Sequence, residues 1–194
     1  MVMEHFMNQF TNQPQPRVPL GGLQFAKLNE EDRDMLEAKF NEVEIREAVA
    51  SCASDKAPGP DGFNFHFIKT IWSTIEGDII SFMKEFHKNE KLVKGLNASY
   101  LTLIPKTKNP ISLKEFRPIS LVGCIYKILA KVLANRLRKI IGKVISTSQS
   151  TFMEGRNLVD SVLTLNELVH DMKLKKMKGI IFKADFEKAF DSVD

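Results

Sequence analysis

Acidic side chains follow a predicted strand near the end of the 194-residue sequence. Residues 180–185 read Ile-Ile-Phe-Lys-Ala-Asp, an apolar run that predicts a strand ending at a carboxylate. Strand alternation places Asp185 and Glu187 on one side and Ala184 and Phe186 on the other. Carboxylates at the end of a strand could hold a divalent cation. An aspartate after a strand is also an ordinary turn residue, so this stretch alone leaves both interpretations open.

Basic side chains are concentrated in one part of the chain. Residues 101–144 carry ten basic side chains against one acidic side chain, Glu115, so this stretch has a charge of +9 while the whole chain has +4. Such a block is typical of proteins that bind the phosphate backbone of nucleic acids. A lysine-rich helix face in contact with solvent is the alternative interpretation. The ten residues are Lys106, Lys108, Lys114, Arg117, Lys127, Lys131, Arg136, Arg138, Lys139 and Lys143.

The sequence disfavours secreted, membrane-bound and zinc-binding proteins. Cys52 and Cys124 both lie in apolar contexts without a Cys or His nearby, which predicts neither a disulfide framework nor a zinc site. The longest apolar runs are shorter than the ~18 residues that a membrane span needs. The first residues also lack a basic segment followed by an apolar one. We therefore expect an intracellular protein of the nucleus or cytoplasm, with no membrane partner.

The remaining pattern predicts the elements that position these side chains. Residues 1–24 are rich in Asn, Gln, Pro and Gly, a composition typical of a flexible arm or linker. Asn41 and Glu44 predict a capping box at the start of a short helix, and residues 55–62 predict a compact turn-forming loop. The later elements are predicted as a helix over 67–86 with a break near Gly77, strands over 100–104 and 119–122, helices over 122–141 and 157–172, and the strand over 180–185. Helices with few strands and no regular alternation favour an α+β fold.

Four sequence blocks, in this order, resemble one family. They are Asp55–Phe63; Leu103–Lys106 with Phe116–Leu121; Tyr126–Ile128, Ala134–Leu137 and Gln149–Phe152 with Gly155 and Arg156; and Asp185–Asp191. Together they resemble the N-terminal part of the reverse transcriptase domain of non-LTR (LINE-type) retrotransposons, particularly those of plants. The resemblance covers about residues 25–194. It implies a partial reverse transcriptase domain after the arm: the fingers of a right-hand polymerase and the first palm strand.

The resemblance also implies roles for individual residues in nucleotidyl transfer. Asp185 corresponds to the first catalytic aspartate, a ligand of two Mg²⁺ ions, and Phe186 would offer its backbone carbonyl to one of them. Phe190 falls where such polymerases place a bulky residue that excludes a ribose 2′ hydroxyl; a core aromatic is the alternative. Arg117 matches the fingers arginine that grips the triphosphate. Lys106 matches its companion lysine, or belongs simply to the basic surface.

Further residues are implied to bind the nucleic acid. The predicted helix over 122–141 has one apolar and one cationic face, and Lys127, Lys131 and Arg138 on the cationic face would follow the template backbone. Gln149 and Arg156 match a block that lies near the template and the nucleotide. The implied partners are an RNA template, a DNA primer and deoxynucleotides. The sequence does not indicate an oligomeric state.

The sequence departs from the family pattern at its end. It stops at Asp194 without the Tyr-X-Asp-Asp motif, the rest of the palm or the thumb, and Glu187 and Asp191 would not replace the missing acids because they lie along the same segment as Asp185. We therefore expect the chain to be inactive by itself. Two hypotheses follow: the N-terminal part of an RNA-directed DNA polymerase, or a non-catalytic nucleic-acid-binding remnant of a decayed or truncated retroelement.

Overall fold

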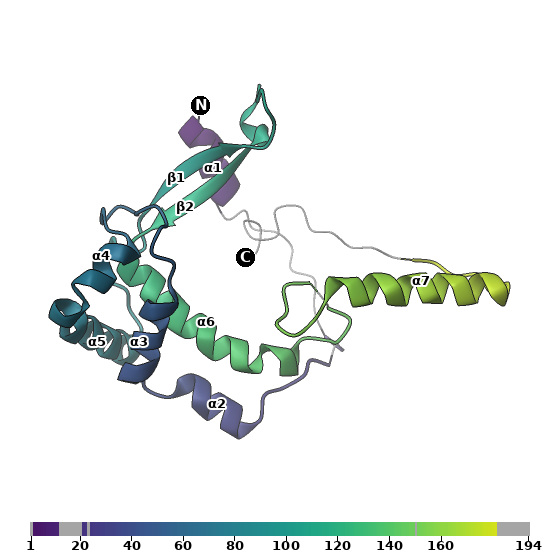
Figure 1. The fold of residues 1–194 in the computed structure, drawn as a ribbon, viewed down its shortest axis with the longest axis horizontal. Helices are drawn as coiled ribbons and strands as arrows, with labels where there is room; N and C mark the ends of the chain where they lie inside the picture. The colour runs from purple at the N-terminus through teal and green to yellow at the C-terminus, as the bar shows by residue number, and fades with distance from the viewer. Residues whose placement is uncertain (1, 12–20, 23, 150, 182–194) are drawn as a thin grey trace. The chain divides into compact units, whose positions relative to one another are not determined.

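The computed structural model describes residues 2–11, 21–22, 24–149 and 151–181, and within them the fold is a mixed α+β arrangement (Figure 1). The chain divides into two compact units, one of residues 26–144 and one of residues 1–25 and 145–194. The first unit contains α2 (Glu30–Glu37), α3 (Glu42–Ser51), α4 (Phe65–Thr70), α5 (Trp72–Asn89), β1 (Ser99–Pro105), the 3₁₀ helix η1 (Leu113–Glu115), β2 (Phe116–Val122) and α6 (Cys124–Val144). The second contains α1 (Val2–Phe10) and α7 (Leu158–Leu174).

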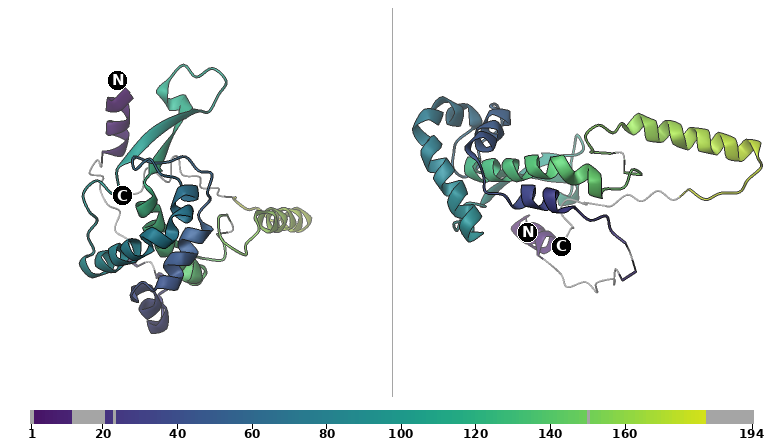
Figure 2. Two further views of the ribbon diagram at one scale, coloured as in Figure 1. Left: turned by 60° about the vertical axis from the view of Figure 1, so that its left-hand side comes forward. Right: turned by 90° about the horizontal axis from the view of Figure 1, so that it is seen from below.

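The core of the first unit lies where α3, α4, α5 and α6 meet, and Figure 2 shows these helices gathered together. Their apolar residues recur every three or four positions, so each helix turns one stripe toward its neighbours. The predicted capping box is confirmed, because the Asn41 side chain accepts the Glu44 N–H at 2.8 Å while Glu44 accepts the Asn41 N–H at 2.7 Å. The fully buried members are Ile45 and Ala48 of α3, Met83 of α5, and Cys124, Ile128 and Val132 of α6.

The predicted helix over 67–86 is two helices, and the predicted position of the break is wrong. The break falls at Ile71, whose φ of −99° and ψ of 13° leave the helical region between α4 and α5. Gly77 lies inside α5, which continues to Asn89. A single glycine costs a helix only ~1 kcal/mol, so the packing of Ile79 and Met83 on the core is sufficient to carry α5 through it.

The two strands form an antiparallel hairpin that projects from the helices of this unit (Figure 1). Both predicted strands are confirmed, and β2 begins three residues earlier than expected, at Phe116. Pro105 is opposite Phe116 and Ser99 is opposite Val122. In the connecting loop the Glu115 carboxylate accepts the Ile111 and Ser112 N–H groups at 2.5 and 2.9 Å, and these backbone hydrogen bonds lower the pKa of Glu115.

The loop of residues 55–62 docks on the junction between β2 and α6. Asp61 Oδ2 accepts the backbone N–H of Cys124, the first residue of α6, at 2.5 Å, so an acid from a distant segment binds the positive end of this helix. Gly59 lies so close to the junction that a Cβ there would stand 2.4 Å from the carbonyl atoms of Val122. Gly62 has a φ of +73°, which glycine adopts without strain.

Of the two helices of the second unit, the sequence predicted α7 but not α1. α1 lies inside the segment predicted to be an arm, and the domain boundary at residue 24 stays a prediction. The predicted cap of α7 is confirmed, because Asn157 Oδ1 accepts the Val159 N–H at 3.1 Å. Ile180 and Ile181 lie outside regular structure, and the rest of the predicted strand over 180–185 lies outside the described residues. None of the described helices is long and apolar enough to cross a membrane.

Candidate nucleotide and nucleic-acid interface

Arg117 is the second residue of β2 and lies on an exposed face of the hairpin. It is opposite Ile104, and residues opposite each other in an antiparallel pair share a face. The same face carries Tyr100, which is 60% exposed, and Ile119. Within the described parts of the chain, the Arg117 guanidinium has no hydrogen-bond or ion-pair partner. A guanidinium with all five N–H donors available on an exposed strand can grip an anion with two parallel hydrogen bonds.

Lys106 lies on the same hairpin, one residue beyond β1. Its backbone N–H donates to Glu115 O at 2.7 Å, and its ammonium donates to Lys114 O at 3.0 Å. Because Lys106 follows Ile104 by two residues, strand alternation directs it to the face that carries Arg117. The hairpin therefore places on one face two cations that are eleven residues apart in the sequence. Among the described residues, the Lys106 ammonium uses one of its three donors, in the bond to Lys114 O.

Lys127, Lys131 and Arg138 lie along one stripe of α6, spaced by four and seven residues. The two lysines are half-buried and Arg138 is exposed. The Lys127 ammonium donates to the Ala57 carbonyl at 3.4 Å, so this lysine reaches the loop of residues 55–62. The predicted cationic face is present on α6, and the first turns of this helix lie against the loop of residues 55–62.

A further lysine, Lys69 of α4, joins this group, and sequence reasoning missed it. Its ammonium donates to Ala50 O at 2.9 Å and to Cys52 O at 2.7 Å, at the C-terminal end of α3. Lys69 lies in a segment whose pattern indicated only an apolar helix. No local signal places it beside α6, because the contact depends on how α3, α4 and α6 pack.

Arg136 is one of the ten basic residues of the 101–144 block, but it lies in the interior and is only 5% exposed. Its guanidinium donates to both carboxylate oxygens of Glu44, at 2.9 Å from Nε and 2.6 Å from Nη2, and stacks over the Phe40 ring at 4.6 Å. It also donates to three carbonyls that connect α2 to α3: Leu36 O at 2.8 Å, Ala38 O at 2.5 Å and Lys39 O at 3.1 Å.

The Arg136 ion pair favours the ionised form of Glu44. Burial by itself would raise the pKa of Glu44, but hydrogen bonds from Arg136 and from the Asn41 N–H, together with the charge of Arg136, hold it below its ordinary value. Lys143 also forms an ion pair within the unit, since its ammonium lies 2.6 Å from the Asp32 carboxylate. Carboxylates of α3 and α2 therefore neutralise Arg136 and Lys143, two of the ten cations of the 101–144 block.

Gln149 and Arg156 lie together in the loop that precedes α7. Arg156 Nη1 donates to Ser146 O and to Gln149 O at 2.5 Å each, and Nη2 donates to Ile145 O at 3.2 Å. The Gln149 amide donates to Thr151 O at 3.0 Å. The guanidinium thus closes this loop by binding three carbonyls, and its role toward a nucleic acid stays a prediction.

The predicted catalytic residue Asp185, the predicted metal ligand Phe186 and the predicted nucleotide-binding residue Phe190 lie outside the described residues. Within the part of the chain that the structure describes, no group of three or more His, Cys, Asp or Glu side chains could hold a metal ion. The described site is therefore a set of cations: one pair on the hairpin and one group around the end of α3.

The sequence that carries the cations of the hairpin and of α6 matches a known protein family. Residues 104–194 match the sequence profile of the family described as "Reverse transcriptase (RNA-dependent DNA polymerase)". The match begins in β1, includes Arg117 and Lys106, and extends through the predicted catalytic motif.

The chain is homologous to part of the reverse transcriptase of non-LTR retrotransposons. It is 30% identical over 167 residues to the "Transposon TX1 uncharacterized 149 kDa protein" of Xenopus laevis, which covers 86% of this chain and 13% of that protein. It is 24% identical to a Pol polyprotein from the type-1 retrotransposable element R1 of Bradysia coprophila, over 77% of this chain and 15% of the relative. It is 28% identical to the corresponding R2 polyprotein of Nasonia vitripennis, over 78% and 14%. The chain thus spans about one seventh of the length of these relatives, and a plant lineage stays a prediction.

Proposed function

We propose that this chain supplies the fingers and the first palm strand of an RNA-directed DNA polymerase of a non-LTR retrotransposon. The single observation that carries the proposal is the Arg117 guanidinium, which has no partner among the described residues and lies with Lys106 on an exposed hairpin face inside the matched region. A nucleoside triphosphate presents the phosphate oxygens that such a pair can bind. The guanidinium would form two parallel hydrogen bonds, and the ammonium would act as a point charge.

The chemical step is assigned to residues near the end of the sequence. Asp185 would bind Mg²⁺ through its carboxylate and Phe186 through its backbone carbonyl, and oxygen atoms of these two kinds are the ligands that Mg²⁺ prefers. When bound, Mg²⁺ supplies activation of the attacking 3′ hydroxyl and neutralises charge on the departing pyrophosphate. Phe190 would lie under the incoming sugar and disfavour a 2′ hydroxyl by steric contact.

The nucleic acid would be an RNA template with a DNA primer, held through its phosphates. Lys127, Lys131 and Arg138 on α6 would provide sequence-independent contacts, and Gln149 and Arg156 would lie near the template. Binding that depends on neutralised phosphates weakens steeply with salt, since bound counterions are released when the complex forms.

Primer extension tests this proposal. The purified chain is incubated with Mg²⁺, deoxynucleotides and a primed RNA template, beside the Asp185→Ala and Arg117→Ala variants. Asp78→Ala, which changes an exposed acid of α5, is the matched control. We expect no incorporation by this chain alone; incorporation that is lost with Asp185→Ala, reduced with Arg117→Ala and retained with Asp78→Ala would refute the hypothesis of a non-catalytic remnant.

The same experiment separates the second hypothesis from the first. RNA binding that weakens with salt, without incorporation, would support a non-catalytic nucleic-acid-binding chain. Binding whose affinity does not change with salt concentration would contradict the electrostatic interface, which both hypotheses assume.

A further inference from the structure

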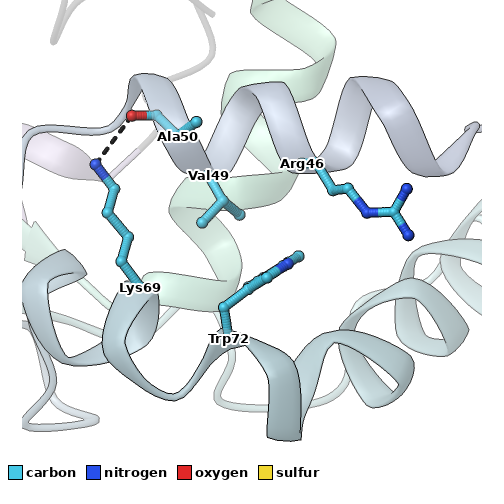
Figure 3. Close-up of a pocket in the computed structure, with 5 residues that line it drawn as sticks. All are labelled: Arg46, Val49, Ala50, Lys69 and Trp72. Carbon is cyan, nitrogen blue, oxygen red and sulfur yellow. Dashed lines mark hydrogen bonds between the residues drawn. The ribbon is translucent and has the colours of Figure 1, made fainter.

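A cavity of about 450 Å³ lies between α3 and the corner where α4 meets α5 (Figure 3). Its lining is Arg46, Val49, Ala50, Lys69 and Trp72. The Trp72 ring lies beneath Val49, with Arg46 on one side and Lys69 on the other. Trp72 is the first residue of α5, directly after the break at Ile71. Part of its indole packs on the core, and part lines the cavity.

The two cations that line the cavity are in different electrostatic states. Arg46 is neutralised, because it forms ion pairs with Glu76 and with Glu42, the latter at 3.4 Å. Lys69 donates only to the carbonyls of Ala50 and Cys52. No carboxylate of the described residues lies within ion-pair distance of its ammonium. Among the described residues, Lys69 therefore has no neutralising partner, and one of its three N–H donors stays unused.

Two lysines of α6 extend this positive charge beyond the cavity. Lys69 binds Cys52 O, and Lys127 binds Ala57 O, so both ammonium groups lie against the same short segment that follows α3. Lys131 is one helical turn from Lys127. Burial raises the pKa of the Cys52 thiol, and the charges of Lys131, Lys69 and Lys127 oppose this increase, as expected if all three lie around it.

Two acidic side chains of the loop of residues 55–62, Asp55 and Asp61, do not cancel the charge of the three lysines. Asp61 is engaged with the backbone N–H groups of Phe63 and Cys124, at 3.2 and 2.5 Å. Asp55 is exposed and has no ion-pair partner within the described ranges. The three lysines carry more positive charge than these two acids carry negative charge. The surface beside the cavity of Trp72 is therefore net positive.

We propose that this cavity binds one nucleotide of a single-stranded nucleic acid, with the base against Trp72, its phosphate at Lys69 and the neighbouring phosphates at Lys127 and Lys131. The inference rests on the proposed nucleic-acid-binding function and adds a defined contact point on α4 and α5. Aromatic side chains bind bases of any sequence by stacking, and adjacent cations follow the backbone. The volume falls within the range of small-molecule sites, ~300–1,000 Å³.

Trp72 is the only tryptophan of the chain, so tryptophan fluorescence reports on the surroundings of this one side chain. The full chain is titrated with a single-stranded oligouridylate of about 12 nucleotides, within the usual span of such sites. We expect saturable quenching of Trp72 fluorescence that weakens with salt. Inorganic tripolyphosphate, which carries phosphates without bases, should compete for the lysines without causing the quenching.

Variants of Lys69 and Trp72 test the two halves of the site by fluorescence anisotropy of the labelled oligouridylate. Trp72→Leu should weaken binding about five- to hundredfold, and Trp72→Phe should weaken it less because a ring remains. Lys69→Gln should also weaken binding, and Lys69→Arg should restore it. Lys88→Gln, at an exposed position of α5, is the matched control. Circular dichroism checks that each variant is folded.

The outcomes separate this inference from the function on which it rests. Binding measured by anisotropy without any change in Trp72 fluorescence would overturn the cavity site and leave the nucleic-acid interface intact. The same conclusion would follow if Lys127→Gln weakened binding while Lys69→Gln did not. The absence of any binding by the wild-type chain would overturn both. The fluorescence titration uses the unchanged chain, so it decides the question even if a variant does not fold.

Discussion

Replacement of Arg136 by methionine should destabilise the helical unit strongly. Methionine fills a similar volume but removes the partner of Glu44 and the donors to the carbonyls of residues 36, 38 and 39. Loss of one partner of a buried ion pair costs ~3–5 kcal/mol, since the other charge stays buried without compensation. The Glu44 side chain is 20% exposed and water can reach it in part, which favours the lower end of that range. We therefore expect a loss of about 3 kcal/mol in the free energy of unfolding.

Urea unfolding followed by far-ultraviolet circular dichroism measures this loss. Arg33→Met is the matched control, because Arg33 forms an exposed pair with Glu30 at 3.7 Å, and such pairs contribute ~0–1 kcal/mol. The double variant Arg136→Met with Glu44→Leu should recover part of the loss, because it leaves no unpaired carboxylate. Equal stabilities for Arg136→Met and Arg33→Met would refute the assignment of Arg136 as the residue that holds the α2–α3 connection on α6.

The same pair predicts a dependence of stability on pH. The folded-state pKa of Glu44 lies below its ordinary value of 4.5, so ionised Glu44 stabilises the folded state above about that pH. As the pH falls below 4.5, the unfolded state gains the proton first and the folded state gains it at its lower pKa, so this contribution is lost. The difference in stability between the wild type and Glu44→Gln should therefore be largest near neutral pH and shrink below pH 4.5. A difference that stays constant down to acidic pH would show that Glu44 acts by shape and not by charge.

Two other features give predictions. Gly59→Ala should destabilise the protein by about 1–3 kcal/mol, because the new Cβ would meet the Val122 carbonyl at 2.4 Å; Gly77→Ala, in open space on α5, should be neutral or stabilising in the same urea experiment. Burial raises the pKa of Cys124 to about 11, and its side chain is almost fully buried, so iodoacetamide at pH 8 should alkylate Cys52 first and Cys124 only as the chain unfolds. Mass spectrometry of peptides measures both rates, and faster labelling of Cys124 would contradict its burial.

Much of the candidate interface could be predicted from local sequence. Two short apolar runs beside prolines, residues 100–104 and 119–122, indicated two strands, and the pairing of these strands brings Arg117 and Lys106 onto one hairpin. The caps at Asn41 and Asn157 were also predictable, because a cap depends on contacts within a few residues. The order of the sequence blocks indicated a reverse transcriptase without any knowledge of packing.

The tertiary structure alone decided which charges face solvent. Arg136 contributes to the +9 stretch, yet it lies on the buried stripe of α6, eight residues after Ile128, where Glu44 and three carbonyls satisfy it. Lys69 lies outside that stretch and still joins the α6 lysines. A count of charges along the chain gives their sum but not their partners. The partners come from helices that are distant in the sequence, and the packing of α3, α4 and α6 brings them together.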